Sequence, residues 1–195
     1  GLNKPGSIGL PVPGTDIVIV DRDDATKIMP QGEPGEICVR GPQVMMGYYK
    51  RQDATTDTMI DDMLRTGDVG YMDEDGYTFI IDRTKDLILA GGFNVYPRHV
   101  EEAIYEHPAV EEVTVIGIPD DYRGQSVKAF VKLKQPEELD QAKLLKFLGP
   151  KLGKAEMPTE IEFRDELPKT MIGKLSKKEL VAEEQAKYEA RKAAG

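Results

Sequence analysis

A lysine near the end of the sequence stands where it could act on an anionic group. Residues 168–174 read Pro-Lys-Thr-Met-Ile-Gly-Lys and form a short polar segment between an expected strand and an expected helix. Lys174 carries a compact positive charge on a flexible stem. Such a charge stabilises the negative charge that builds up when one anion attacks another at phosphorus. The plain alternative is an ordinary surface lysine in a loop.

A carboxylate in the first half of the chain is suited to hold a sugar. Asp68 closes the sequence Arg-Thr-Gly-Asp at residues 65–68, and Gly67 before it allows a close approach of the backbone. Because a carboxylate has two acceptor oxygens, it can bind two neighbouring hydroxyl groups such as those of a ribose. The alternative is a polar turn in front of a strand.

Residues 82–97 join a charged stretch to a pair of glycines. The stretch from Asp82 to Asp86 lacks the bulky apolar side chains that would fix it by packing, which suits either a hinge or an exposed turn. Gly91 and Gly92 follow an apolar run and allow positive φ or close contact between the backbone and a ligand. A simple turn after a strand would also explain them.

In this order and spacing, the three segments resemble the adenylate-forming (AMP-binding) superfamily of acyl-CoA synthetases, and within it the long-chain fatty acyl-CoA ligases. The resemblance runs from about Gly6 to about Glu183. It implies that Lys174 is the catalytic lysine. It also implies that Asp68 and Arg83 bind the ribose and nearby phosphate of ATP.

The resemblance further implies a lid that moves. In the family, a C-terminal lid rotates about a hinge residue, matched here by Lys85, between two half-reactions. The first forms an acyl-adenylate and pyrophosphate from a carboxylate and ATP. The second transfers the acyl group to coenzyme A with release of AMP. Gly91, Gly92 and Phe93 would line the tunnel for the pantetheine arm of coenzyme A, although Phe93 and Tyr96 could equally belong to the core.

These implications predict the C-terminal part of an ATP-dependent long- or medium-chain fatty acid–CoA ligase. The family's phosphate loop, its acyl pocket and the glutamate that helps to hold Mg²⁺ are not found in this sequence. The Mg²⁺ ligands are therefore expected in the missing N-terminal domain of the same protein, and the chain is expected to be inactive alone. The expected substrates are a fatty acid, ATP and coenzyme A.

Two other functions stay open. One is an aryl- or other carboxylate–CoA ligase, because the acyl pocket that would decide is absent. The other is the noncatalytic lid of an adenylation domain, which docks a carrier protein.

Two positions depart from the family pattern. Asp82 stands where the family often has glycine, and residues 176–178 read Ser-Lys-Lys where arginines are common. Arg123 and Lys128 are candidates for contact with the nucleotide of coenzyme A.

The composition excludes several classes of protein. The 195 residues are 39% hydrophobic and 31% charged, as in ordinary soluble globular proteins. The net charge of −9 disfavours nucleic-acid binding, which needs a concentrated basic face. A local group of lysines instead suits a small anionic ligand: Lys169, Lys174, Lys177 and Lys178.

Cysteine content and apolar runs bear on the location of the protein. The single Cys38 fits a reducing cytoplasm, and it stands in an apolar run where it would be a small buried hydrophobe. No apolar run approaches the roughly 18 residues that would span a bilayer. We therefore expect a cytoplasmic protein. This expectation is compatible with a peripheral contact between the complete protein and a membrane.

Turn signals and apolar patterns predict an α+β fold with two domains. Residues 1–83 have short apolar runs and frequent turns, which indicate a small β-rich, distorted barrel-like end of the large N-terminal AMP-binding domain. An Asp-Gly step in residues 73–76 predicts a hairpin, and residues 53–59 predict a brief helix. Residues 84–195 mix strands with helices and are expected to form an α+β lid domain.

Within the expected lid, a helix begins at Pro97, which suits the first helical turn, and ends before Pro108. Residues 113–118 predict a buried strand. Alternating apolar residues from Val127 to Leu133 predict a strand buried on one face only. A capping box at residues 176–179 begins the last helix.

Overall fold

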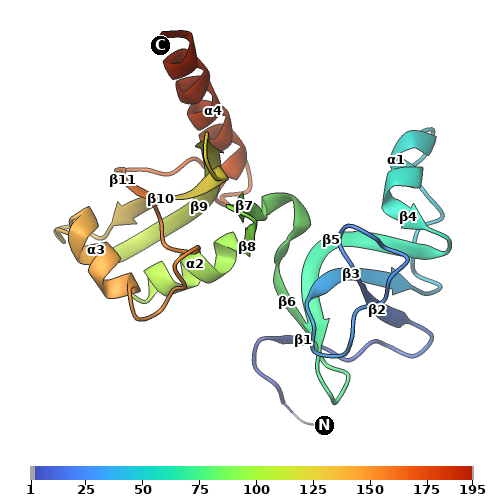
Figure 1. Ribbon diagram of the computed structural model, residues 1–195. Coiled ribbons are helices and arrows are strands. Elements are labelled where there is room, and N and C mark those ends of the chain that lie inside the picture. The colour runs from blue at the N-terminus through green and yellow to red at the C-terminus, as the bar shows by residue number, and fades with distance from the viewer. Residues whose placement is uncertain (1–2, 195) are drawn as a thin grey trace. The chain divides into compact units, whose positions relative to one another are not determined.

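A computed structural model describes residues 3–194 and divides the chain into two compact units (Figure 1). The first unit ends at Lys85 and the second begins at Asp86, two residues beyond the boundary expected from the sequence. A short 3-10 helix, η1 (Thr84–Asp86), spans the division. Each unit has its own β-sheet.

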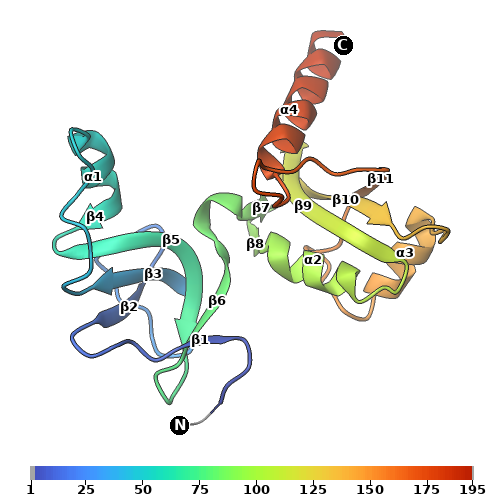
Figure 2. The same cartoon turned by 180° about the vertical axis from the view of Figure 1, so that it is seen from behind.

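The first unit is built on an antiparallel sheet. Its elements are β1 (Ser7–Gly9), β2 (Asp16–Val20), β3 (Gly35–Arg40), α1 (Gln52–Thr58), β4 (Met59–Ile60), β5 (Met63–Met72) and β6 (Thr78–Arg83). The strand order is β1-β6-β5-β3-β2, and β4 pairs with β5. The long β5 bends strongly as it crosses the sheet (Figures 1 and 2). The expected β-rich unit with one brief helix is confirmed.

A tight hairpin sets the register between β5 and β6. The Asp73 N–H donates to the Tyr77 carbonyl at 2.9 Å, and the Gly76 N–H donates to the Asp73 carbonyl at 3.0 Å. Gly76 has a φ of +82°, a conformation that glycine adopts without steric cost. The hairpin expected from the Asp-Gly step is confirmed.

An extra residue in β6 then shifts this register. The two strands pair in step from the hairpin to Gly70, beyond which Ile81 is bulged out of the ladder. Because of this bulge, Arg83 lies directly opposite Asp68. In the unshifted register Asp82 would face Asp68, and the two negative charges would repel each other.

The second unit is a sheet with helices on both faces. Its elements are β7 (Ile88–Ala90), β8 (Phe93–Val95), α2 (Pro97–Tyr105), β9 (Val110–Asp120), β10 (Gly124–Leu133), α3 (Gln141–Leu148), β11 (Glu160–Phe163) and α4 (Lys177–Ala194). β10 pairs antiparallel with β9 along its length, in parallel with β11, and with β7 at Gly124. Helices α2 and α3 lie on one face and α4 on the other (Figures 1 and 2). The expected α+β fold is confirmed.

Both faces of β9 and β10 are buried. The face under α2 and α3 carries an apolar core that includes Val115, Ala129 and Leu144. The opposite face packs Phe130 of β10 against Leu180 of α4. The prediction that the strand at residues 127–133 is buried on one face only is therefore wrong, because α4 covers the second face.

Helix α2 also covers the free edge of β9. The Val115 N–H donates to Glu101 Oε1 at 2.9 Å, and the Val113 N–H donates to the Tyr105 hydroxyl at 3.3 Å. Glu101 and Tyr105 stand four residues apart and so project from the same side of α2. Their oxygens replace the strand neighbour that an edge strand lacks.

A buried lysine fastens α4 to the sheet. The Lys128 ammonium lies 2.9 Å from Glu162, 3.0 Å from Glu184 and 3.2 Å from Glu160. Only 6% of the Lys128 side chain is exposed. Burial acts to lower the pKa of Lys128, but the three carboxylates outweigh it, and the pKa lies above its ordinary value. The charge of Lys128 is therefore committed to holding three elements together.

No helix in the part of the chain that the structure describes is both long and apolar enough to cross a membrane.

We predict that acid weakens the attachment of α4 through Glu183. Hydrogen bonds from Arg164 and Lys187 lower the pKa of Glu183 from 4.5 to about 2. A carboxylate whose pKa is lowered by folding stabilises the fold above its unfolded-state pKa, and this contribution disappears as the pH falls toward the folded-state pKa. The urea midpoint of β10 and β11, followed by NMR, should therefore fall between about pH 4.5 and about pH 2.

The variant Glu183→Gln should flatten this fall, because its side chain does not titrate. A matched control is Glu138→Gln, which removes an exposed glutamate with no ion pair in residues 3–194. An unchanged pH slope in the Glu183→Gln protein would contradict the prediction.

Candidate functional site

The structure brings Asp68 and Arg83 together. Arg83 Nε lies 3.1 Å from Asp68 Oδ1, as the register of β5 and β6 requires. The Asp68 N–H donates to Thr66 Oγ1 at 3.1 Å, and the Thr66 hydroxyl donates to the Ile37 carbonyl at 2.8 Å. These bonds fix the backbone of the turn, and the carboxylate keeps acceptor capacity for a ligand because the arginine contacts one oxygen.

A buried glutamate supports this turn from the neighbouring strand β3. Glu36 Oε1 accepts the Gly67 N–H at 3.2 Å, and Glu36 Oε2 accepts Arg65 Nε at 2.9 Å. Gly67 has a φ of +73°, where a side chain would be strained. Glu36 was missed from the sequence because nothing in an apolar strand segment marks a residue as the partner of a turn 31 positions later.

A cavity of about 390 Å³ opens beside the turn. It is lined by Glu36, Asp57, Thr58, Arg65, Thr66, Gly67, Arg83, Thr84 and Lys85. Thr84 Oγ1 is buried there and has no hydrogen-bond partner among residues 3–194. The expected hinge residue, Lys85, is exposed and belongs to the same lining. The cavity therefore presents basic, acidic and hydroxyl side chains, together with the backbone of Gly67, to a polar ligand.

The loop at residues 168–176 closes on itself and exposes Lys174. The Thr170 N–H donates to the Lys174 carbonyl at 2.7 Å, and the Gly173 N–H donates to the Thr170 carbonyl at 2.8 Å. Gly173 has a φ of +79°, which lets the chain reverse there. Lys169 and Leu175 form a β-bridge at the base of the loop. The backbone of Lys174 is thus fixed while its side chain is exposed.

The basic group expected around Lys174 is only partly available to a ligand. Lys169 pairs with Glu112 at 2.6 Å, and Lys177 pairs with Glu101 at 2.9 Å. No carboxylate among the described residues forms an ion pair with Lys174. The sequence pattern predicted the four lysines but not which of their charges are neutralised, because the two glutamates lie far from them in the chain.

Gly91 and Gly92 form the turn of a second hairpin, between β7 and β8. Their φ values are +60° and +84°, and Ala90 pairs with Phe93 across the turn. Two central residues at positive φ are typical of the tight turns that suit twisted strands. The Gly91 N–H also donates to the Arg123 carbonyl at 2.9 Å, which ties this turn to the one between β9 and β10.

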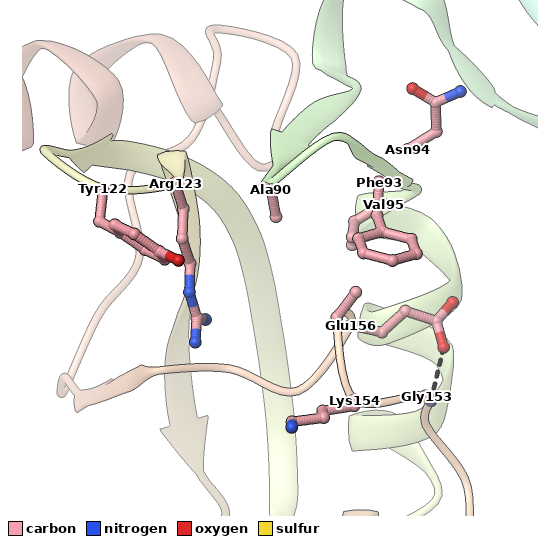
Figure 3. Close-up of a pocket in the computed structure, with 11 residues that line it drawn as sticks. Ala90, Phe93, Asn94, Val95, Tyr122, Arg123, Gly153, Lys154 and Glu156 are labelled. Carbon is pink, nitrogen blue, oxygen red and sulfur yellow. Dashed lines mark hydrogen bonds between the residues drawn. The ribbon is translucent and has the colours of Figure 1, made fainter.

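A larger cavity of about 680 Å³ lies beside the glycine turn (Figure 3). Its lining comprises Ala90, Gly91, Phe93, Asn94, Val95, Tyr122, Arg123, Gly153, Lys154, Ala155 and Glu156. Phe93 is 64% exposed and lines the cavity, so it does not belong to the core. Tyr96 is partly buried and is not part of this lining.

Cationic side chains extend into this cavity from two sides. Figure 3 shows Arg123 and Lys154 reaching toward the same space, with Phe93 on the far wall. Glu156 is turned away from them, because it accepts the Gly153 N–H at 2.7 Å and contacts His99 Nδ1 at 2.8 Å. A cavity with an apolar wall and two cations suits an elongated ligand that carries an anionic end.

Arg123 and Lys128 were the two candidates for contact with the nucleotide of coenzyme A. Arg123 lines this cavity, whereas Lys128 does not. Lys128 lies under α4, surrounded by carboxylates, on a face that the alternating pattern predicted to be exposed. Lys154 and Tyr122 were missed, because each is an ordinary polar loop residue in the sequence.

Two family models match the chain. The model described as AMP-binding enzyme matches residues 1–49, and the model described as AMP-binding enzyme C-terminal domain matches residues 99–174. The second match contains Glu101, Glu112, part of the lining of the larger cavity and Lys174. Both models describe parts of AMP-binding enzymes, and the chain belongs to this family.

The chain is similar to several curated CoA ligases. The chain is 50% identical over 184 residues to a long-chain-fatty-acid–CoA ligase from Bacillus subtilis, covering 94% of the chain and 33% of that protein. It is 40% identical over 179 residues to 2-succinylbenzoate–CoA ligase from Bacillus cytotoxicus, covering 92% of the chain and 36% of that protein. The chain thus spans about one third of the length of the curated relatives it matches.

Solved structures show the same fold. The crystal structure of ATP-bound MatB from Rhodopseudomonas palustris matches with a TM-score of 0.87 at 38% identity, covering 93% of this chain and 36% of that one. The apo structure of the same enzyme matches with a TM-score of 0.67 at the same identity and coverage. The two structures of MatB therefore differ from each other over the matched region.

We predict that the glycine turn tolerates only residues able to adopt positive φ. Among residues 3–194, no heavy atom outside Gly92 and its two chain neighbours lies within 4 Å of the position that a Cβ would take, so backbone strain alone opposes a substitution there. Gly92→Ala should destabilise the second unit by about 1–2 kcal/mol in urea unfolding. Gly92→Asn should cost less, since asparagine visits this conformation more readily. Equal losses in the two variants would contradict strain as the cause.

Proposed function

We propose that the complete protein is an ATP-dependent long- or medium-chain fatty acid–CoA ligase, in which this chain supplies the nucleotide-binding turn, the hinge and the lid. The observation that carries the proposal is the closed loop that leaves the Lys174 ammonium exposed. This loop, as far as Lys174, lies within a segment that matches the C-terminal domain of AMP-binding enzymes. The high identity to a long-chain-fatty-acid–CoA ligase supports a fatty acid as the substrate.

In the first half-reaction, a fatty acid carboxylate oxygen attacks the α-phosphorus of ATP. A new O–P bond forms, the bond to the β-phosphate oxygen breaks, and pyrophosphate leaves. The ammonium of Lys174 stabilises the charge that builds up on the phosphoryl oxygens, more strongly in the transition state than in the ground state. Asp68 accepts hydrogen bonds from the ribose hydroxyls, and Arg83 holds Asp68 in place and adds its own donors.

In the second half-reaction, the thiol of coenzyme A attacks the acyl carbonyl carbon of the adenylate. A C–S bond forms, the C–O bond to the phosphate breaks, the thiol proton is lost, and AMP leaves. The backbone of Gly91 and Gly92 and the exposed ring of Phe93 border the path of the pantetheine arm. The cavity beside them supports this role, because Arg123 and Lys154 provide cations for phosphate groups.

The two half-reactions require the second unit to work in two placements. The loop of Lys174 is attached near Glu112 of β9, whereas the cavity adjoins the turn that follows Asp120. These residues stand eight positions apart on one strand, which is about 26 Å at the rise of a strand. We propose Lys85 as the hinge that exchanges them.

Mg²⁺ has no fitting set of ligands here. Among residues 3–194 no group of three or more His, Cys, Asp or Glu side chains could hold a metal ion. The carboxylate of Asp68 is already paired with an arginine. We propose that the N-terminal domain of the complete protein supplies the Mg²⁺ ligands.

We also propose that the complete protein is cytoplasmic and makes peripheral contact with membranes, from which long-chain fatty acids would be drawn.

A second candidate function is a ligase for an aryl or other carboxylate, favoured by the 40% identity to a 2-succinylbenzoate–CoA ligase. Assay of the complete protein against a panel of carboxylates, with pyrophosphate release as the readout, separates the two candidates.

We predict that Lys174→Ala in the complete ligase lowers the rate of adenylation on the order of 10²–10³-fold. The measurement is exchange of labelled pyrophosphate into ATP in the presence of fatty acid. Lys146→Ala is the matched control, because Lys146 is exposed on α3 and forms no ion pair among the described residues, and this variant should retain the normal rate. Normal exchange in the Lys174→Ala enzyme would refute the proposed role.

We predict that Lys85→Pro separates the two half-reactions. Proline fixes φ and removes a backbone donor, so it restricts rotation at the hinge. Adenylation should persist, while thioester formation from a preformed acyl-adenylate should be lost. Lys85→Ala should retain both steps. If thioester formation survives in the proline variant as well as adenylation does, the hinge lies elsewhere.

A further inference from the structure

The loop that carries Lys174 is held by an ion pair on each side. On the N-terminal side, Lys169 Nζ lies 2.6 Å from Glu112 Oε1 of β9. On the C-terminal side, Lys177 Nζ lies 2.9 Å from Glu101 Oε1 of α2. Lys174 therefore stands between two lysines whose charges are neutralised by carboxylates of the sheet and its covering helix.

Both carboxylates are fixed in place by the fold. Glu101 Oε1 also accepts the Val115 N–H at the edge of β9, at 2.9 Å. Glu112 exposes only 19% of its side chain, and its second oxygen, Oε2, is buried without a hydrogen-bond partner in residues 3–194. Lys169 forms the ion pair with Glu112 and Lys132 of β10 adds an electrostatic attraction, so loss of Lys169 removes the direct partner of a largely buried carboxylate.

The base of the loop is also packed, whereas its tip is not. Leu167 is buried in the cluster of Phe130 and Leu180, and Leu175 packs against the same cluster. Between them, Met171 and Ile172 are almost fully exposed. The ion pairs thus act at the two points where the chain leaves the packed sheet, and they set the direction in which the tip projects.

We propose that Glu112 and Glu101 are positioning residues for Lys174. They bind the lysines on either side, so that the loop presents one free ammonium in one orientation. This inference rests on the proposed function, since it assigns a task to the loop only if Lys174 meets the α-phosphate of ATP. Neither glutamate touches substrate.

Loss of either ion pair would slow adenylation in two ways. A freed Lys169 or Lys177 would compete with Lys174 for the phosphate oxygens, in a geometry that does not match the transition state. A loop released at one end would also lose orientation, and a misplacement of about 1 Å can cost on the order of a hundredfold in rate. Because one pair remains in each single variant, we expect a loss on the order of tenfold.

The experiment compares the unsubstituted complete ligase with four single variants of it. These are Glu112→Gln, Lys169→Met, Glu101→Gln and Lys177→Met. Glutamine at 101 can still accept the Val115 N–H, so the strand edge is retained while the ion pair is removed. We expect kcat for pyrophosphate exchange to fall on the order of tenfold with an unchanged KM for ATP. Thioester formation from a preformed acyl-adenylate should stay normal, because that step does not use the loop.

Two matched controls test whether any lost ion pair has the same effect. Glu111→Gln breaks the pair of Glu111 with Lys132 at 2.8 Å, one residue from Glu112 on the same strand but not attached to the loop. Lys146→Met removes an exposed lysine of α3 that forms no ion pair among residues 3–194. Both control variants should retain the normal exchange rate.

A single variant could lose stability in general, and the rates of both half-reactions would then fall. The double variant Glu112→Lys with Lys169→Glu, which reverses the two charges, tests that case. Recovery of most of the exchange rate in the reversed pair supports the inference, and no recovery overturns it. Normal kcat in all four single variants also overturns it. That outcome differs from a failure of the proposed function, which would appear as normal exchange in the Lys174→Ala enzyme.

Discussion

The antiparallel pairing of β9 with β10 is the interaction on which the second unit depends. It runs from Gly124 opposite Asp120 to Leu133 opposite Val110, and helices cover both of its faces. One end of this rigid pair carries the turn with Arg123, beside the glycine hairpin and the larger cavity. The other end carries Glu112, which holds the loop of Lys174. A single packed hairpin therefore fixes the two proposed sites at its opposite ends.

Ion pairing decides which charges the protein can offer to a ligand. Glu36 neutralises Arg65 inside the first unit, and three carboxylates hold Lys128 under α4. Glu112 and Glu101 likewise hold the lysines on either side of Lys174. Lys174, Arg123 and Lys154 form no ion pair among residues 3–194, and they lie where the proposed chemistry needs positive charge.

Local signals were sufficient to predict much of the fold. The Asp-Gly hairpin, the helix after Pro97 and the glycine turn follow from the conformational limits of single residues, and the structure contains all three. The Ile81 bulge that places Arg83 opposite Asp68 has no such signal. Glu36, Glu101 and Glu112 could not be identified either, because their partners are distant in the chain. The alternating pattern around Lys128 failed for the same reason, since carboxylates from β11 and α4 bury that lysine.

The central claim is that the fold holds the Lys174 loop so that this one ammonium meets the reacting phosphate. A double-mutant cycle in the complete ligase tests it most directly, by measuring the effect of Glu112→Gln on pyrophosphate exchange with lysine and then with alanine at position 174. If Glu112 acts through Lys174, the variant should slow exchange on the order of tenfold when the lysine is present and hardly at all when it is absent. The same slowing with alanine at position 174 would contradict the account.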